Sequence, residues 1–105
     1  MNGVERIAAE RKRQIEKKSW TAKHDDQWNA GELAKAAACY AMTEVTRKLP
    51  IGNIKVSIRE MLWPFGWLYW KPTPENRIRE LEKAGALIAA EIDRLLRLEE
   101  AEEAL

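Results

Sequence analysis

The stretch Thr73-Pro-Glu-Asn-Arg-Ile-Arg-Glu-Leu-Glu-Lys-Ala-Gly-Ala-Leu-Ile-Ala-Ala-Glu-Ile-Asp-Arg-Leu-Leu-Arg-Leu98 decides the fold of this chain. Isoleucine and leucine recur through it at helical spacing, while Thr73 stands in a capping position and Pro74 at the first helical position. The pattern predicts a helix from about residue 74 to about residue 103. Its length makes it the backbone of the fold or of a helical dimer interface.

Two more helices are expected upstream. A first helix from about residue 3 to 18 follows Asn2, a capping residue, and its residues at helical spacing are Val4, Ile7, Ala8, Arg11 and Ile15. An alanine-rich stretch that opens at Asn29 predicts a second helix from about residue 29 to 48. The small residues of this second helix allow a neighbouring helix to approach closely.

The chain between the last two helices is irregular and rich in tryptophan and proline. Pro50 and Gly52 break the helical pattern, and Pro64 with Gly66 prevents the aromatic run from forming one long helix. The partly alternating residues 54–59 have no partner strand, so no sheet is predicted. We therefore expect an all-α fold of three to four helices with an irregular Trp/Pro-rich central segment, in one domain over residues 1–105.

Composition argues against several classes of function. With 18 basic and 17 acidic residues, the formal net charge is +1, so nucleic acid is not an expected partner. No run approaches the roughly twenty apolar residues of a membrane span, and the N-terminus lacks a signal-peptide core, so we expect a cytoplasmic protein without membrane contact. The single cysteine, Cys39, lies among alanines and is expected to be a buried, inert thiol.

Charge is distributed unevenly along the chain. Basic residues outnumber acidic ones through residue 23, whereas the chain ends in Glu99-Glu-Ala-Glu-Glu103. This polarity would orient an antiparallel self-assembly or pair two helices within one subunit.

Two stretches carry most of the chemistry: Lys18-Ser-Trp-Thr-Ala-Lys-His-Asp-Asp26 and Trp63-Pro-Phe-Gly-Trp-Leu-Tyr-Trp-Lys-Pro72. They place stacking aromatics beside a His-Asp-Asp cluster and several cations, as a pocket for a flat, charged ligand requires. We expect tryptophans to stack on rings, basic side chains to meet phosphate, and one aspartate to accept hydrogen bonds from ribose hydroxyls. The candidate ligand-binding residues are Arg13, Trp20, His24, Asp25, Asp26, Trp63, Trp67, Trp70 and Lys71.

Each candidate also has a structural explanation. Tryptophans in a small domain are often core residues, and an exposed aromatic cluster is equally typical of a protein interface. Asp25 or Asp26 would cap the following helix. Three adjacent residues do not chelate one ion comfortably, and the usual three- or four-residue ligand spacing is absent around His24, so no metal or cofactor is predicted.

The enzymatic alternative is an all-helical nucleotide pyrophosphohydrolase of the MazG type, whose magnesium ions are held by paired Glu-x-x-Glu and Glu-x-x-Asp motifs. Here Glu32 is followed three residues later by Lys35, and Glu91 by Arg94. The Glu-x-x-Glu pairs near the C-terminus belong to an acidic tail that is typical of a solvated face. We therefore predict a binding protein with no catalytic residues.

Several motifs together resemble a group of small tailed-phage proteins: Ser19-Trp-Thr, His24-Asp-Asp, Gly31-Glu-Leu-Ala-Lys-Ala-Ala, Trp63-Pro and Lys83-Ala-Gly-Ala-Leu-Ile-Ala-Ala-Glu-Ile-Asp-Arg94. Residues 5–95 are similar, more distantly, to the ryanodine-receptor-type domain, although Ser19 replaces its usual glycine and Trp63-Pro64 reverses its usual Pro-Trp order. Bacterial and phage versions of that domain resemble nucleotide-signal binding domains.

The resemblance implies a protein of the host-cell cytoplasm that sequesters a nucleotide-derived small molecule, such as a host immune second messenger. Sequestration needs nearly complete burial of the ligand, which favours a homo-oligomer. The alternative partner is a host protein, which the chain would inhibit through its aromatic patch.

Overall fold

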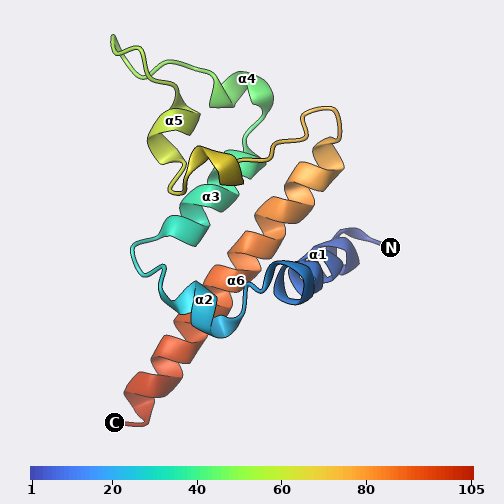
Figure 1. The fold of residues 1–105 in the computed structure, drawn as a ribbon, viewed down its shortest axis with the longest axis vertical. Helices are drawn as coiled ribbons and strands as arrows, with labels where there is room; N and C mark the ends of the chain where they lie inside the picture. The colour runs from blue at the N-terminus through green and yellow to red at the C-terminus, as the bar shows by residue number, and fades with distance from the viewer.

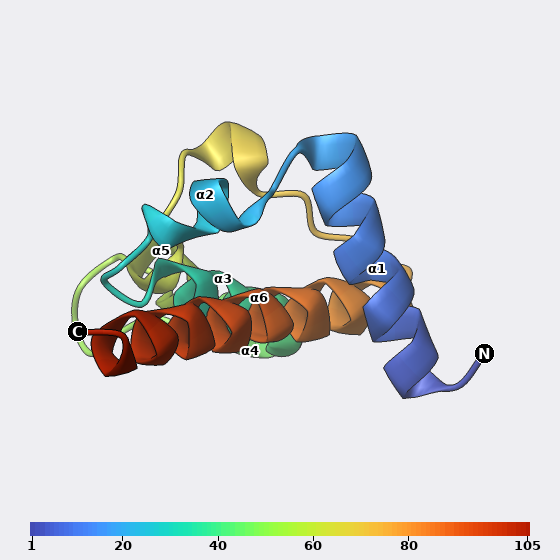
Figure 2. The ribbon, with the colours of Figure 1, turned by 90° about the horizontal axis from the view of Figure 1, so that it is seen from below.

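The computed structural model describes residues 1–105 and consists of six α-helices without a β-strand, which confirms the all-α prediction. The 27-residue helix α6 (Arg77–Glu103) forms the axis of the molecule. Helix α3 (Glu32–Ala41) packs along one side of α6, and α1 (Gly3–Lys18) crosses it on another side (Figures 1 and 2). The short elements are α2 (Ala22–Asp26), α4 (Glu44–Arg47), α5 (Ile58–Leu62) and the 3-10 turn η1 (Trp67–Tyr69). No helix combines the length and apolarity that crossing a membrane would require.

Helix α1 has the predicted bounds because both of its ends are locally specified. The Asn2 side chain accepts a hydrogen bond from the Glu5 N–H, and the Glu5 carboxylate accepts one from the Asn2 N–H, each at 3.0 Å. Ser19 ends the helix in a left-handed conformation with φ of 58°.

The buried face of α1 differs from the predicted apolar stripe. Val4 is 78% exposed and Ile15 is 41% exposed, whereas Glu10 and Gln14 are buried. Glu10 Oε1 lies 2.8 Å from Arg79 of α6 and 2.7 Å from Arg13. Burial acts to raise the pKa of Glu10, but hydrogen bonds from Arg13 and Arg79 outweigh it, and the pKa is lower than the ordinary 4.5. A buried ionic contact between α1 and α6 therefore takes the place of an apolar one.

The second predicted helix, from about residue 29 to 48, is divided into α3 and α4. Gly31, with φ of 82°, precedes α3, so Asn29 is not the cap. Met42 is extended and ends α3, and Thr43 then caps α4 by accepting a hydrogen bond from the Thr46 N–H at 3.3 Å. Between α1 and α3 the chain forms an additional short helix, α2, that was not predicted.

Helix α6 begins later than the sequence indicated. Asn76, not Thr73, is its cap and accepts a hydrogen bond from the Arg79 N–H at 3.2 Å. The Thr73 N–H donates instead to Glu80 Oε2 at 3.1 Å, so residues 73–76 form a turn that leads into the helix.

The core lies where α3 meets α6, and small side chains bring the two helices close together. The cysteine belongs to this core as predicted, and burial raises the pKa of its thiol to about 11. The buried cluster consists of Leu33, Ala36, Ala37, Cys39, Tyr40, Trp63, Ala84, Leu87 and Ala90.

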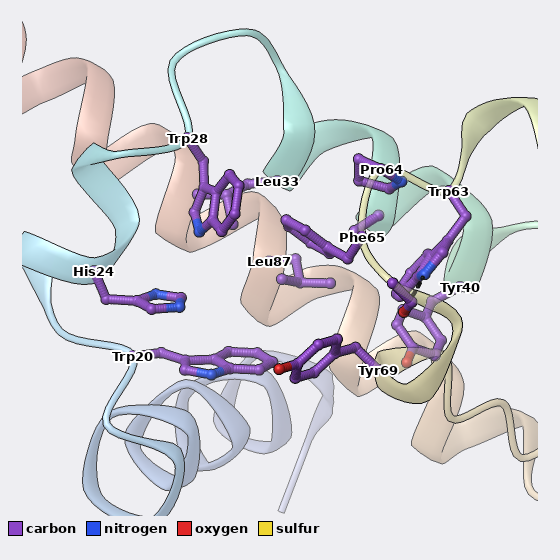
Figure 3. Close-up of a pocket in the computed structure, with 12 residues that line it drawn as sticks. Trp20, His24, Trp28, Leu33, Tyr40, Trp63, Pro64, Phe65, Tyr69 and Leu87 are labelled. Atoms are coloured by element: carbon purple, nitrogen blue, oxygen red, sulfur yellow. Dashed lines mark hydrogen bonds between the residues drawn. The ribbon is translucent and has the colours of Figure 1, made fainter.

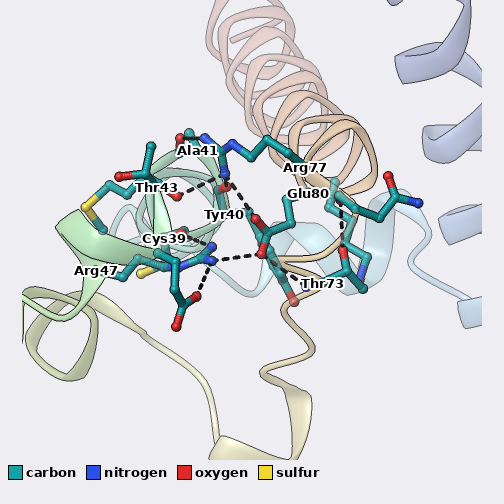
Figure 4. A network of polar contacts seen from close by, with 12 residues as sticks. Cys39, Tyr40, Ala41, Thr43, Arg47, Thr73, Arg77 and Glu80 are labelled. Carbon is teal, nitrogen blue, oxygen red and sulfur yellow. Dashed lines mark hydrogen bonds and ion pairs between the residues drawn. The ribbon is translucent and has the colours of Figure 1, made fainter.

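A buried ion pair joins α4 to α6 beside the core (Figure 4). Arg47 of α4 and Glu80 of α6 are 2.9 Å apart, and each side chain is 1% exposed. Glu80 also accepts from Arg77 at 3.2 Å, and Arg47 donates to the Cys39 carbonyl at 3.2 Å. Arg77 further donates to the carbonyls of Tyr40 and Met42, at 2.8 and 3.0 Å, at the end of α3. Helices α3, α4 and α6 are thus joined by charged hydrogen bonds as well as by packing.

Candidate ligand-binding pocket

A pocket of about 350 Å³ lies between α2, α3, α6 and the central aromatic segment. Nine of its twelve lining residues are hydrophobic. In Figure 3, Trp28 and Phe65 lie on one side of the space, and Trp20 and Tyr69 lie on the opposite side. Much of the remaining lining comes from Leu33 and Tyr40 of α3, Leu87 of α6 and Trp63. A mostly apolar concavity of this size is typical of small-molecule sites.

Helix α2 and its flanks bring three pocket residues together. Thr21 caps α2 by accepting a hydrogen bond from the His24 N–H at 3.4 Å. His24 lies in α2, and Trp20 and Trp28 lie just outside it, four residues before and after His24. The Trp20 and His24 rings stack with 5.8 Å between centroids and 2° between planes, while His24 and Trp28 meet edge to face at 6.3 Å.

The polar corner of the pocket is an oriented histidine. His24 Nδ1 lies 2.9 Å from Asp25 Oδ1, and Asp25 Oδ2 accepts from Arg11 Nη2 at 2.8 Å. Asp25 is 1% exposed, so the carboxylate is buried between two partners. Because a carboxylate only accepts hydrogen bonds, this contact assigns the proton to Nδ1 and leaves Nε2 available to the pocket. Asp25 therefore positions His24 and does not cap α3.

The indole nitrogen of Trp28 adds a second polar group at this corner. Trp28 Nε1 is buried and has no hydrogen-bond partner. Figure 3 shows the nitrogen-bearing edge of Trp28 turned toward His24. The accessible polar group of this corner is therefore the His24 imidazole, and the unpaired Trp28 Nε1 lies buried near it.

Of the nine predicted site residues, Trp20, His24 and Trp63 line the pocket, and Asp25 supports it from behind. Trp63 is also a core residue, 8% exposed, with Nε1 donating to the Gly66 carbonyl at 3.2 Å. The structure does not bring Arg13, Asp26, Trp67, Trp70 or Lys71 to the pocket lining.

The other predicted aromatics form a separate group. Trp70 packs on Tyr40 and Trp63, with centroids 4.8 Å away in both cases. Trp67 is 53% exposed. The Arg59 guanidinium lies 5.0 Å from the Trp67 ring centre and 5.8 Å from that of Trp70. Sequence reasoning did not single out Arg59.

The predicted phosphate-binding cations Arg13 and Lys71 lie outside the pocket lining. Arg13 pairs with Glu10 of its own helix at 2.7 Å, and Lys71 is exposed, with its backbone N–H donating to the Tyr40 hydroxyl at 3.1 Å. Asp26, the candidate acceptor for ribose, pairs with Arg97 of α6 at 2.7 Å. A ligand in the pocket would therefore meet rings and one imidazole inside, and any phosphate would lie outside the lining.

Sequence reasoning left four important lining residues unassigned. Trp28 could have been found from its four-residue spacing after His24, and Phe65 and Tyr69 from their place in the aromatic run. Leu87 carries no such signal, because its position depends on how α6 packs against α3.

The carboxylates expected of the enzymatic alternative have local partners. Glu91 pairs with Arg94 at 2.6 Å, and Glu32 accepts from the Ala30 N–H at 2.6 Å. Over residues 1–105, no group of three or more His, Cys, Asp or Glu side chains is placed to hold a metal ion.

No protein-family model, curated protein or solved structure matches this chain. A function for the protein is therefore inferred from the pocket and its surroundings.

Proposed function

We propose that this protein binds, without turning it over, a small molecule that carries a flat heteroaromatic ring, such as the base of a nucleotide-derived compound. The observation that carries the proposal is the pocket itself, with Trp20 and Tyr69 facing Trp28 and Phe65 across it. A ring that stacks on Trp20 would meet Trp28 edge to face, because the Trp20 plane is parallel to that of His24, which is inclined by 70° to that of Trp28. Stacking on an aromatic side chain is worth about 1–3 kcal/mol per base in nucleic-acid complexes. The imidazole of His24 would then fix the orientation of the ring.

The chemistry of the lining supports binding rather than turnover. The lining includes no serine, threonine or cysteine nucleophile. The nearest carboxylate, Asp25, is engaged by Arg11 and His24. His24 is left as a hydrogen-bonding group without a neighbouring nucleophile to activate.

The pocket volume limits what can be enclosed. About 350 Å³ lies at the lower end of the range for small-molecule sites and suits one ring system with a few substituents. A larger nucleotide would insert its base and leave its phosphates at the surface. The motif resemblance to small phage proteins suggests a biological use for such binding, namely sequestration of a host immune second messenger in the host cytoplasm.

A ligand-depletion experiment tests the proposal. Purified protein is incubated with nucleotide second messengers, deoxynucleoside triphosphates, nucleosides and free bases, and the free compounds are measured before and after heat denaturation. Depletion of a compound with intact recovery after heating is the expected result. Conversion of the compound would identify an enzyme, and failure to deplete any ring compound would contradict the proposal.

Two tryptophan variants provide a matched comparison. Trp20→Ala removes a pocket wall and should weaken retention at least tenfold, because about 1.4 kcal/mol of stacking corresponds to that factor. Trp67→Ala removes an exposed tryptophan outside the pocket and should leave retention unchanged. Circular dichroism checks that both variants keep their helices. Equal loss in both would contradict the assigned pocket.

The exposed aromatic turn favours a second candidate function, inhibition of a host protein. Leu68 is 89% exposed and Tyr69 is 67% exposed, beside the half-exposed Trp67. Apolar side chains projecting this far are typical of protein-binding sites. If Leu68→Glu abolished binding to a host protein while small molecules were never depleted, this candidate would replace the first.

A further inference from the structure

We infer that the protein forms an antiparallel homodimer through an apolar stripe on α6. The stripe consists of five large side chains that are between 45% and 60% exposed although they lie on the central helix of the molecule: Ile78, Leu81, Ile88, Ile92 and Leu95. This inference is independent of what the pocket binds.

The stripe lies on the side of α6 that faces away from the core. At 100° per residue, Leu81, Ile88 and Leu95 fall within about 40° of one another, and the buried Leu87 and Ala90 fall on the opposite side of the helix. The stripe residues, with Gly85 between them, are spaced alternately three and four apart, as in helices that pair along their length. A second helix is therefore the partner that this surface fits.

Helix α1 borders the stripe at its middle. A Cβ placed on Gly85 would lie only 2.5 Å from Ile7 Cδ1, so Ile7 occupies the space beside this glycine. Val4, one turn before Ile7, is 78% exposed and extends the apolar surface at this border. The partner helix would thus contact α1 as well as α6.

Charge selects a second copy in the antiparallel orientation. The last turns of α6 carry Glu99, Glu100, Glu102 and Glu103, and this end projects beyond the other helices (Figure 1). A parallel pair would place these two acidic ends side by side. An antiparallel pair brings each one to the partially exposed Arg77 and the helix N-terminus of the partner, where negative charge is favourable.

The stripe is also self-complementary about its centre. With Ile88 at the two-fold axis, Leu81 of one subunit lies opposite Leu95 of the other, and Ile88 meets its own copy. Covering the exposed parts of these side chains and their neighbours removes on the order of 500 Å² per subunit, or about 1,000 Å² in total, which is the size of a weak, reversible interface. A second copy therefore satisfies the spacing and the charge, and the area fits a reversible dimer.

Sedimentation equilibrium of the full chain tests the interface. The wild type should have twice the 12.1 kDa mass of one chain at micromolar concentration. Ile88→Glu should raise the dimer dissociation constant at least a hundredfold with unchanged circular dichroism. Ile54→Glu alters an equally exposed isoleucine in a loop and should leave the dimer intact. A monomeric wild type, or an Ile88→Glu variant that remains dimeric, would overturn the inference.

Disulfide trapping tests the orientation. Leu81→Cys mixed with Leu95→Cys should give a cross-linked heterodimer under mild oxidation, while either variant alone should cross-link slowly. The native Cys39 is buried and should not interfere. Rapid cross-linking of Leu81→Cys with itself would show a parallel pair and overturn the antiparallel arrangement.

Discussion

The chain contains two buried ion pairs that resemble each other in geometry and differ in what surrounds them. Arg47 and Glu80 are 2.9 Å apart in the core, and Arg11 and Asp25 are 2.8 Å apart beneath the pocket. The carboxylate of Glu80 accepts hydrogen bonds from Arg47, from Arg77 and from the Thr73 N–H, and none of these groups lines the pocket. Asp25, in contrast, accepts its second hydrogen bond from His24, which lines the pocket. The first network joins helices, and the second ends at a group that can meet a ligand.

Buried polar atoms without a hydrogen-bond partner are also distributed unevenly between the two networks. Arg47 leaves only Nε without a partner, whereas Arg11 leaves Nε and Nη1 unpaired, and Gln14 Oε1 and Trp28 Nε1 near α2 are also unpaired. Four of the five such atoms therefore belong to the α1 and α2 side of the molecule. Buried polar atoms without partners are unfavourable, and in this chain they concentrate beside the candidate pocket.

The largest expected effect on stability comes from breaking the Arg47–Glu80 network. Glu80→Gln removes the buried carboxylate and leaves Arg47 paired with only the partly exposed Glu44, at 2.6 Å, so the free energy of unfolding should fall by about 3 kcal/mol, the lower end of the cost of breaking a buried pair. Urea denaturation measures the loss. The double variant Arg47→Met with Glu80→Leu replaces both charges by apolar groups and should lose less than the single change. A single variant as stable as the wild type would show that the pair contributes nothing.

Removing His24 from the Arg11–Asp25–His24 network should affect ligand binding rather than stability. His24→Ala should weaken binding of the ring compound ten- to a hundredfold, about 1.4–2.8 kcal/mol, because the pocket loses its orienting group. The free energy of unfolding should change by less than about 1 kcal/mol, since His24 is partly exposed. Calorimetric binding and urea denaturation on the same variant separate the two effects. A strongly destabilised variant with normal affinity would reverse the proposed division of roles.

The buried Glu10 provides a pH-dependent test at the α1–α6 contact. Its pKa is lower in the folded protein than the ordinary 4.5, so it contributes stability above about pH 4.5 and loses that contribution as the pH falls through its lowered folded-state pKa. Denaturation curves across this acidic range should show a steeper loss for the wild type than for Glu10→Gln. Parallel curves for the two proteins would argue against the ionic contact with Arg79.

The smallest expected effect is on the reactivity of Cys39, which serves as a probe of the Arg47–Glu80 network. Burial raises its pKa to about 11, so the folded protein holds almost no thiolate at neutral pH, and alkylation should require opening of the core. Because Arg47 donates to the Cys39 carbonyl, Glu80→Gln should accelerate alkylation severalfold, while His24→Ala should not. Mass spectrometry of timed reactions measures the rates. Equal acceleration by both variants would show that the two networks are coupled.

Sequence patterns predicted helices best where the determinants are local. The bounds of α1 follow from Asn2, Glu5 and Ser19, all within or beside the helix. The break at Met42 was missed because no proline or glycine stands between Ala41 and Lys48, and only the Thr43 cap marks the new helix. The buried Glu10 was missed because its partner Arg79 is distant in sequence.

The same distinction between local and tertiary determinants applies to the residues of the candidate site. The pairing of Trp20 with His24 follows from local spacing, so the sequence indicated both. Placing Arg13 or Lys71 relative to the pocket required knowing the crossing of α1 over α6 and the path of the central segment, neither of which is encoded locally. Tertiary packing also determines that Trp67 is exposed while Trp63, four residues earlier, is in the core.

The pocket is assembled from residues as far apart in the chain as Trp20, Tyr69 and Leu87, so an unfolded chain contains no binding site. Any compound that occupies the pocket therefore stabilises the folded state alone. By mass action, a ligand at a hundred times its dissociation constant adds about 2.7 kcal/mol to the free energy of unfolding. For a domain of this size that corresponds to a rise in melting temperature of roughly 10 °C or more, given about 4–8 °C per kcal/mol. Thermal melting in an unfractionated metabolite extract would consequently reveal a compound that binds the pocket before its chemical identity is known.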